Sequence, residues 1–321
     1  MTPLAQPPDG LILRGLDGSN PLAFLAALGT LRTLSLAWPE RQVKMAWTQY
    51  AGAWRPVVQA SRIFDENEVI ALFADRLKMM QNHLALQLAD DLSVSPDEFR
   101  RHAGKCVEAA HGAADRDARI AAEFAASFAC DVLKNEQGKV QDTALRTMSG
   151  AGHQHFLKFM RQIVKQTTPD HLRKTLFAQW TYDDPVAGQT LRWDPADDSR
   201  YALQWRDPSG DSSRQQCGGM LGANRLAIEG LPLIVCAPAG NLLRTTGFVG
   251  TGSRDTFWTW PIWFCPVSLD VCRSLLAQAA LVDDDLQRGA RLKNRGIAAA
   301  FRCQRITVGK FRSFAPATAV F

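Results

Sequence analysis

The chain has 321 residues, 46% hydrophobic and 21% charged, with 37 lysines and arginines against 32 aspartates and glutamates. This composition suits one large or two to three small domains with a sizeable core, and it excludes a disordered protein. No apolar run reaches the roughly 18 residues of a membrane-spanning helix, and the polar, Pro-rich residues 1–10 predict no secretory signal. Seven cysteines in no disulfide-like pattern indicate a reducing cytoplasm.

Residues 1–60 predict a small mixed α/β module. We expect a strand at residues 10–13 and then a helix over 21–36, for which Asn20-Pro21 supplies the N-cap and the first turn. The helix is apolar nearly all round, which indicates that it is buried. Two short strands are expected at 43–48 and 54–58.

Residues 61–180 have a helical pattern. Ser95-Pro96-Asp97-Glu98 matches a capping box, and Thr168-Pro169-Asp170 is a second helix start. The predicted helices cover 66–89, a long stretch from 96 with a break near Gly112 that ends at 135–138, a piece at 142–148, a helix after the glycines at 150–152, and 169–177.

Residues 181–321 are richer in Pro, Gly and Trp, and they predict a strand-rich region with one helix at 269–281. Residues 207–222 are polar and predict a surface loop. We expect six or more of the nine tryptophans to lie in the core, because the indole is so large. The sequence therefore predicts an α+β fold of three segments: 1–60, 61–180 and 181–321. The extended pieces are expected at 201–205, 231–236, 245–249, 257–264 and 304–311.

No enzyme signature is present: the sequence has no phosphate-binding loop, dinucleotide fingerprint, nucleophile elbow or His-Glu-x-x-His. His153 and His155 are the one close histidine pair, and in a helix they point apart, so we expect no metal site there. Asp194 and the pair Asp197-Asp198 are typical of turns and do not form a nuclease motif. We therefore expect no catalysis and no cofactor.

The basic residues cluster, although a net charge of +5 is mild. Residues 286–321 carry eight cations and no acid, directly after Asp283-Asp284-Asp285. A second basic stretch runs from Lys158 to Lys174. Clustering of this kind favours a polyanionic partner, and a solvated basic face is the alternative.

The candidate nucleic-acid contacts follow from these clusters. Lys158, Arg161 and Lys165 share one helix face and predict phosphate contacts, which Arg173 and Lys174 extend. The Asn224-Arg225 pair is a candidate base reader, because Asn can pair with adenine and Arg with guanine; an N-cap is the alternative for Asn224. The cations Arg302, Arg305, Lys310 and Arg312 flank the last extended segment and are candidates to line a strand channel.

Several sequence blocks cover nearly the whole chain, and none is a catalytic signature. They read GLDGSNPLAFLAALG at 15–29, SGAGHQHFL at 149–157, RWDP at 192–195, RYAL at 200–203, GANRLA at 222–227, TTGF at 245–248, TWPIW at 259–263 and RITVGKF at 305–311. Together these blocks resemble a protein family of the type I-G (formerly I-U) CRISPR–Cas systems. Its members occur as separate chains or as extensions of the helicase–nuclease, and they are similar in role to the large subunit of Cascade.

The resemblance implies a non-catalytic, DNA-binding subunit of an RNA-guided surveillance complex. Such a subunit reads the protospacer-adjacent motif in double-stranded target DNA, opens the duplex and holds the displaced strand. Its partners are the other Cascade subunits with CRISPR RNA, and the helicase–nuclease that it docks. Two alternatives stay open: a metal-dependent nuclease using Asp194 or Asp198, and an assembly adaptor that does not bind DNA.

Overall fold

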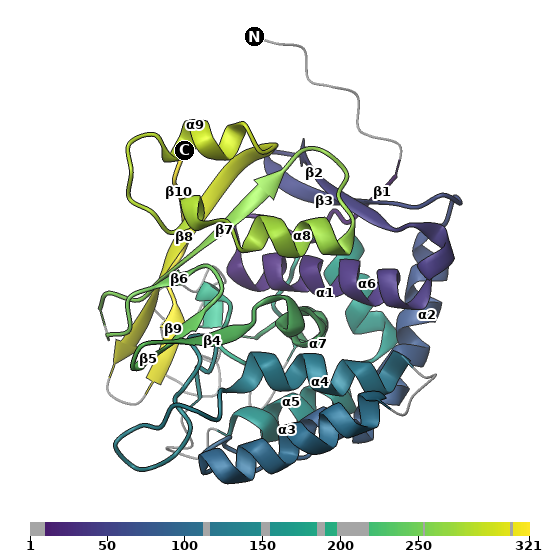
Figure 1. Ribbon diagram of the computed structural model, residues 1–321. Coiled ribbons are helices and arrows are strands. Elements are labelled where there is room, and N and C mark those ends of the chain that lie inside the picture. Colours follow the sequence, from purple (N-terminus) through teal and green to yellow (C-terminus); the bar gives the residue numbers. More distant parts are fainter. Residues whose placement is uncertain are drawn as a thin grey trace, which may run out of the picture.

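The computed structural model describes residues 10–111, 116–148, 155–184, 190–197, 218–252, 254–308 and 311–321. It has the α+β class and the strand-rich C-terminal region that the sequence predicts (Figure 1). The helices are α1 (Pro21–Ala37), α2 (Glu66–Met79), α3 (Pro96–His111), α4 (Arg116–Phe128), α5 (Phe156–Gln166), α6 (Pro169–Phe177), α7 (Leu221–Gly230), α8 (Leu269–Leu276) and α9 (Arg288–Lys293). The strands are β1 (Leu11–Ile12), β2 (Lys44–Tyr50), β3 (Ala53–Gln59), β4 (Cys236–Ala239), β5 (Leu242–Thr245), β6 (Phe248–Val249), β7 (Phe257–Trp263), β8 (Ile297–Val308), β9 (Phe311–Phe314) and β10 (Thr318–Ala319).

Two antiparallel sheets are present, and in Figure 1 the first lies above α1 while the second runs down the left side. The first has the order β1-β3-β2, and its β2–β3 hairpin turns at Ala51-Gly52, where both residues have positive φ. The second has the order β10-β8-β7-β6, with β9 paired to another part of β8. The sheets meet where Trp263 Nε1 donates to the Met45 carbonyl at 2.8 Å. A separate hairpin, β4–β5, lies beside them.

Helix α1 is the buried element that the sequence predicts. Asn20 caps it, since the Asn20 Oδ1 accepts from the Ala23 N–H at 3.0 Å, and every residue from Pro21 to Leu34 is buried. Phe24 packs against the aromatic side chains of both sheets, with its ring centroid 5.8 Å from that of Trp47. The prediction for the tryptophans is confirmed. The six buried ones are Trp38, Trp47, Trp193, Trp258, Trp260 and Trp263.

On its other side, α1 lies against α7 with almost no side chain between the two backbones. A Cβ on Gly29 of α1 would lie 1.8 Å from the Leu226 carbonyl oxygen. A Cβ on Gly230 of α7 would lie 2.5 Å from the Leu25 carbonyl oxygen. These two glycines therefore set how closely the helices approach.

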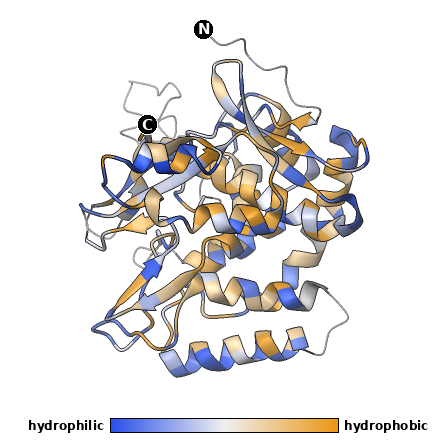
Figure 2. Cartoon of the chain, turned by 45° about the horizontal axis from the view of Figure 1, so that its top comes forward, coloured by the Kyte–Doolittle hydropathy of each residue, from blue (hydrophilic) through white to orange (hydrophobic). Residues whose placement is uncertain are grey.

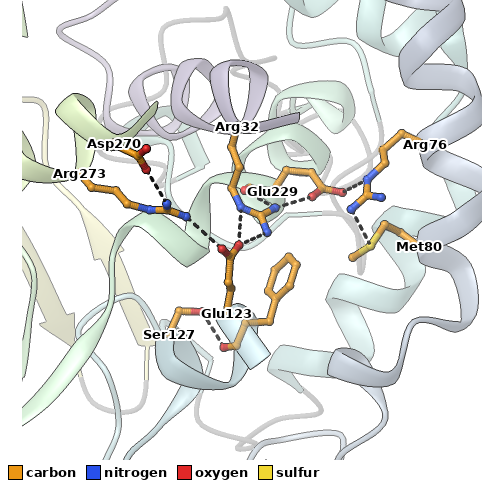
Figure 3. A network of polar contacts seen from close by, with 9 residues as sticks. Arg32, Arg76, Met80, Glu123, Ser127, Glu229, Asp270 and Arg273 are labelled. Carbon is orange, nitrogen blue, oxygen red and sulfur yellow. Dashed lines mark hydrogen bonds and ion pairs between the residues drawn. The ribbon is translucent and has the colours of Figure 1, made fainter. Parts of the chain in front are cut away.

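A network of buried charges surrounds this contact (Figure 3). Arg32 on α1 has no exposed side-chain surface, and it pairs with Glu229 of α7 at 3.3 Å and with Glu123 of α4 at 2.5 Å. Arg225 lies 2.9 Å from the same Glu229, and Arg76 of α2 lies 3.8 Å from it. Burial alone would raise the pKa of Glu229, but Arg225, Arg76 and Arg32 lower it to about 2.

Some predicted helices end early or do not form. Helix α2 ends at Met79, short of residue 89, and two 3-10 turns follow it; α4 ends at Phe128, short of 135–138. Residues 142–148 are not helical, and Arg146 there bonds to Asp142, to the Met148 carbonyl and to the Asp91 carbonyl. The predicted break at Gly112, the strand at 201–205 and most of the predicted loop at 207–222 lie outside the described residues.

One hydrophobic cluster extends from Leu13 to Phe314 and includes residues of all three predicted segments. Figure 2 shows its hydrophobic residues gathered in the middle of the molecule, with hydrophilic ones on the outer helices and loops. No helix in the described part of the chain combines the length and apolar character needed to cross a membrane. The six cysteines in this part are free thiols.

The glycine contact predicts opposite effects for two Gly→Ala variants. Gly29→Ala forces α1 and α7 apart, so we expect a loss of several kcal/mol, as for other overpacked cores. Gly104→Ala, in open space on α3, is the control and should stabilise by about 0.5–1 kcal/mol. Urea unfolding measures both, and a neutral Gly29→Ala would contradict the close contact.

The charge network predicts that Glu229→Gln destabilises strongly. The amide leaves three guanidinium groups without their shared carboxylate, and breaking a buried pair costs about 3–5 kcal/mol. Asp270→Asn is the control, since Asp270 pairs with Arg273 on the surface and we expect little change. Equal effects of both variants on urea unfolding would refute a structural role for Glu229.

Candidate nucleic-acid interface

Helix α5 carries two of the predicted phosphate contacts on its exposed side. Five buried residues hold the helix to the core, and Lys158 and Lys165 point to solvent with no ion pair to a described residue. Arg161 does not join them. Its guanidinium turns back to donate to the Leu86 carbonyl at 2.6 Å and to pair with Asp90.

The two cations of α6 contact neighbouring side chains. Arg173 donates to Asn67 Oδ1 at 2.9 Å, and Lys174 pairs with Asp183 at 3.1 Å. The bond and charge of Asp183 raise the pKa of Lys174. Both side chains still reach solvent, so phosphate contact here would compete with these partners.

The C-terminal cations do not line an open channel among the described residues, which corrects the sequence prediction. Arg302 pairs with Asp284 at 2.9 Å, and Arg312 pairs with Asp142 at 2.6 Å. Arg305 is buried and donates to the Ala144 carbonyl, and burial lowers the pKa of Arg305 to about 10. Lys310 lies outside the described residues.

Asn224 and Arg225 are buried, so the prediction of a base reader at this pair is wrong. Asn224 accepts from the Leu191 N–H at 2.9 Å and donates to the Met220 carbonyl, while Arg225 belongs to the charge network. The N-cap alternative for Asn224 is also wrong, because α7 begins at Leu221 with Met220 as its cap. Both side chains stabilise the fold.

A cavity of about 710 Å³ is lined by parts of the chain that are far apart in sequence. The segment before α1 contributes Asn20, the β2–β3 hairpin contributes Tyr50 and Arg55, the end of α6 leads to Trp180, and Asp194 closes one wall. This volume lies in the range of small-molecule and cofactor pockets.

Asp194 is the buried acid of this cavity, with 2% of its surface exposed. Its Oδ1 accepts from Asn20 Nδ2 at 3.1 Å and from the Ala196 N–H at 2.9 Å, as expected of a turn-forming Asp. Tyr182 interacts with the same carboxylate, yet Oδ2 has no well-formed hydrogen bond to a described residue. Burial raises the pKa of Asp194.

The buried Asp194 carboxylate contributes to raised pKa values of two neighbouring groups. Burial and the charge of Asp194 raise the pKa of Asp197 to about 7, although Asp197 accepts a hydrogen bond from Thr190 at 2.5 Å. Burial and then Asp194 raise the pKa of the Tyr182 phenol as well. Asp197 therefore holds a proton at a pH where exposed aspartates are ionised.

Two arginines face the cavity from other sides. Arg55 on β3 is half-buried, and its Nε has no hydrogen-bond partner among the described residues. Arg14 pairs with Glu66 at 2.8 Å, and its guanidinium lies over the Phe177 ring. The cavity thus has an acidic wall and a basic edge.

No three His, Cys, Asp or Glu side chains within the described ranges lie close enough to hold a metal ion. Asp198 and His153 lie outside those ranges. Neither a protein-family model nor a curated protein matches this sequence.

The sequence did not predict the cavity, because the residues that line it are recognisable only by other, local roles. Asn20 is predictable as a cap and Asp194 as a turn residue, and both do those jobs. Arg55 lies in a strand, and the alternating pattern of a strand indicates which side of the sheet a side chain is on. The pattern does not indicate which residues that side chain contacts. No local signal indicates that these three residues meet.

The raised pKa of Asp197 predicts a pH effect on stability. Unfolded Asp titrates near 3.9, so the native state binds the extra proton between about pH 4 and 7, and stability falls as pH rises through that window. Asp197→Asn should remove about one proton, or ~1.4 kcal/mol per pH unit, from that slope. An unchanged slope in urea unfolding from pH 4 to 8 would argue against this assignment.

Proposed function

We propose that the protein is a non-catalytic, DNA-binding subunit of a type I CRISPR RNA-guided surveillance complex, similar in role to the large subunit. In this role it recognises the protospacer-adjacent motif in target DNA, helps to open the duplex, holds the displaced strand and docks the helicase–nuclease. Cleavage belongs to that partner.

The resembling blocks that the structure describes contact one another. The Trp260 Nε1 of one block donates to the Gly18 carbonyl of another at 2.8 Å. Asn20 bonds to Asp194 of a third block, and Gly29 faces α7, which carries the block at 222–227. Blocks separated by up to 242 positions therefore form one structural unit.

The exposed side of α5 is the observation that carries DNA contact in this proposal. Lys158 and Lys165 are seven residues apart, which places them on the same side of the helix, about 10 Å apart along its axis. Neither has an acidic partner among the described residues, so each can neutralise a phosphate at no cost in broken ion pairs.

The double variant Lys158→Glu/Lys165→Glu tests this surface. We expect weaker binding to every short duplex and a salt slope flatter by about two units, one for each lost phosphate contact. Binding would be titrated at several salt concentrations. Lys44→Glu/Lys134→Glu, on β2 and on the loop after α4, makes the same change in net charge and should have little effect.

Other results would favour the alternatives. An equal loss of affinity in both double variants would mean that net charge alone matters and that α5 is not the contact surface. Duplex cleavage that requires a divalent metal would favour a nuclease. A chain that binds no duplex would favour an assembly adaptor or a site completed by other subunits.

A further inference from the structure

Two free cysteines from distant parts of the sequence meet where the end of α4 packs against β4. Cys236, the first residue of β4, donates its thiol hydrogen to the Ala126 carbonyl oxygen at 3.3 Å, a bond that spans 110 positions of sequence. Ala126 lies in the last turn of α4, and Cys130 follows just beyond the end of that helix. The hydrogen bond to α4 therefore brings the thiol of Cys236 close to that of Cys130.

The two thiols of this pair differ in charge state and are both within reach of solvent. Burial, and then the neighbouring Cys130, raise the pKa of the Cys236 thiol to about 12, so Cys236 is a protonated thiol at neutral pH. Cys130 and Cys236 each keep part of their surface exposed, whereas the other described cysteines apart from the exposed Cys265 are buried. A small oxidant therefore reaches this pair more readily than the buried thiols.

We propose that Cys130 and Cys236 are a modification site, at which hydrogen peroxide converts the two thiols into a reversible disulfide. The Cys130 thiolate attacks one peroxide oxygen, the O–O bond breaks, and the leaving hydroxide takes up the proton that Cys130 released, which gives water and a sulfenic acid. The Cys236 sulfur then attacks the Cys130 sulfur and the S–O bond breaks, so that the hydroxyl leaves as water with the Cys236 proton. Two thiols are thereby oxidised by two electrons, and the peroxide is reduced to water.

The disulfide ties the β4–β5 hairpin to α4. This hairpin is a two-stranded sheet separate from the other two, so contacts outside the sheets hold it in place. On the β5 side, the Gln141 side chain bonds to the Asn241 carbonyl and to the Leu243 N–H, each at 3.0 Å. On the β4 side, the Cys236 thiol is a weak donor, and the disulfide adds a covalent bond there that also closes a long loop in the unfolded chain. In a reducing compartment thiols would reverse it once the peroxide is gone.

The first test treats the wild-type protein with hydrogen peroxide, blocks the remaining thiols with iodoacetamide in urea, and identifies the non-reduced peptides by mass spectrometry. We expect a linked pair of peptides that carry Cys130 and Cys236 and that dithiothreitol separates. The buried Cys106, Cys272 and Cys303 should carry the iodoacetamide label. The proposal is overturned if Cys130 and Cys236 stay free, become sulfonic acids without a link, or pair with other cysteines.

Serine variants test the two roles. Cys130→Ser and Cys236→Ser should each abolish the link, and Cys265→Ser is the matched control, an exposed cysteine whose loss should leave the link intact. With Cys236→Ser, peroxide should leave a sulfenic acid on Cys130 that dimedone labels. With Cys130→Ser, dimedone should not label Cys236, because that thiol is protonated. Labelling of Cys236 and not of Cys130 would contradict the assigned roles.

Two further measurements ask whether the fold creates the pair and what the bond does. Peroxide treatment in urea should give a mixture of pairings, and an equal yield of the 130–236 link in folded and unfolded protein would overturn the proposal. Thermal melting should show a Tm several degrees higher after oxidation of wild type, and no such rise for Cys130→Ser. An unchanged Tm in linked wild-type protein would overturn the claim that the bond ties the hairpin to α4.

Discussion

The contact between α1 and α7 is the constraint on which the rest of the structure depends. Gly29 and Gly230 bring the two backbones together, and this leaves no room for a side chain to separate them. Arg32 is consequently buried beside Glu229, and its charge has to be paired inside the protein. The network that pairs it extends to α2, α4 and α8, so one helix contact fixes the positions of five helices (Figure 3).

The same two helices position the acidic wall of the cavity. Asn224 on α7 holds the Leu191 backbone, and Asn20 at the start of α1 holds the Asp194 carboxylate three residues later. Each side chain uses its amide for a structural bond, and together they fix a short segment that has only one 3-10 turn of its own. The geometry of the cavity therefore follows from core packing.

Sequence patterns predicted the elements with local causes. The Asn20-Pro21 and Thr168-Pro169 helix starts depend on neighbouring residues, and they formed as expected. The strands predicted at 43–48 and 54–58 also formed, as β2 and β3, and they pair as a hairpin that was not predicted. The ion pairs of the basic residues could not be predicted, because their partners lie far away in the sequence. Arg312 finds Asp142 across 170 positions, and Arg161 finds Asp90 across 71. A run of cations in a sequence thus shows how many positive charges are present, and the fold determines how many of them form ion pairs.

The charges around the cavity are divided between two sides of it. Asp194 and Asp197 line or adjoin the inner wall, and they would repel a phosphate brought close to them. Arg55 lies on the hairpin side, and Arg14 is already paired with Glu66, so attraction for phosphate is confined to that edge. Within the acidic wall, burial disfavours the ionised form of Asp194, and the hydrogen bonds from the Ala196 N–H, Asn20 and Tyr182 oppose that effect. The charge of the wall is therefore set by the same structural hydrogen bonds that hold the Asp194 segment in place.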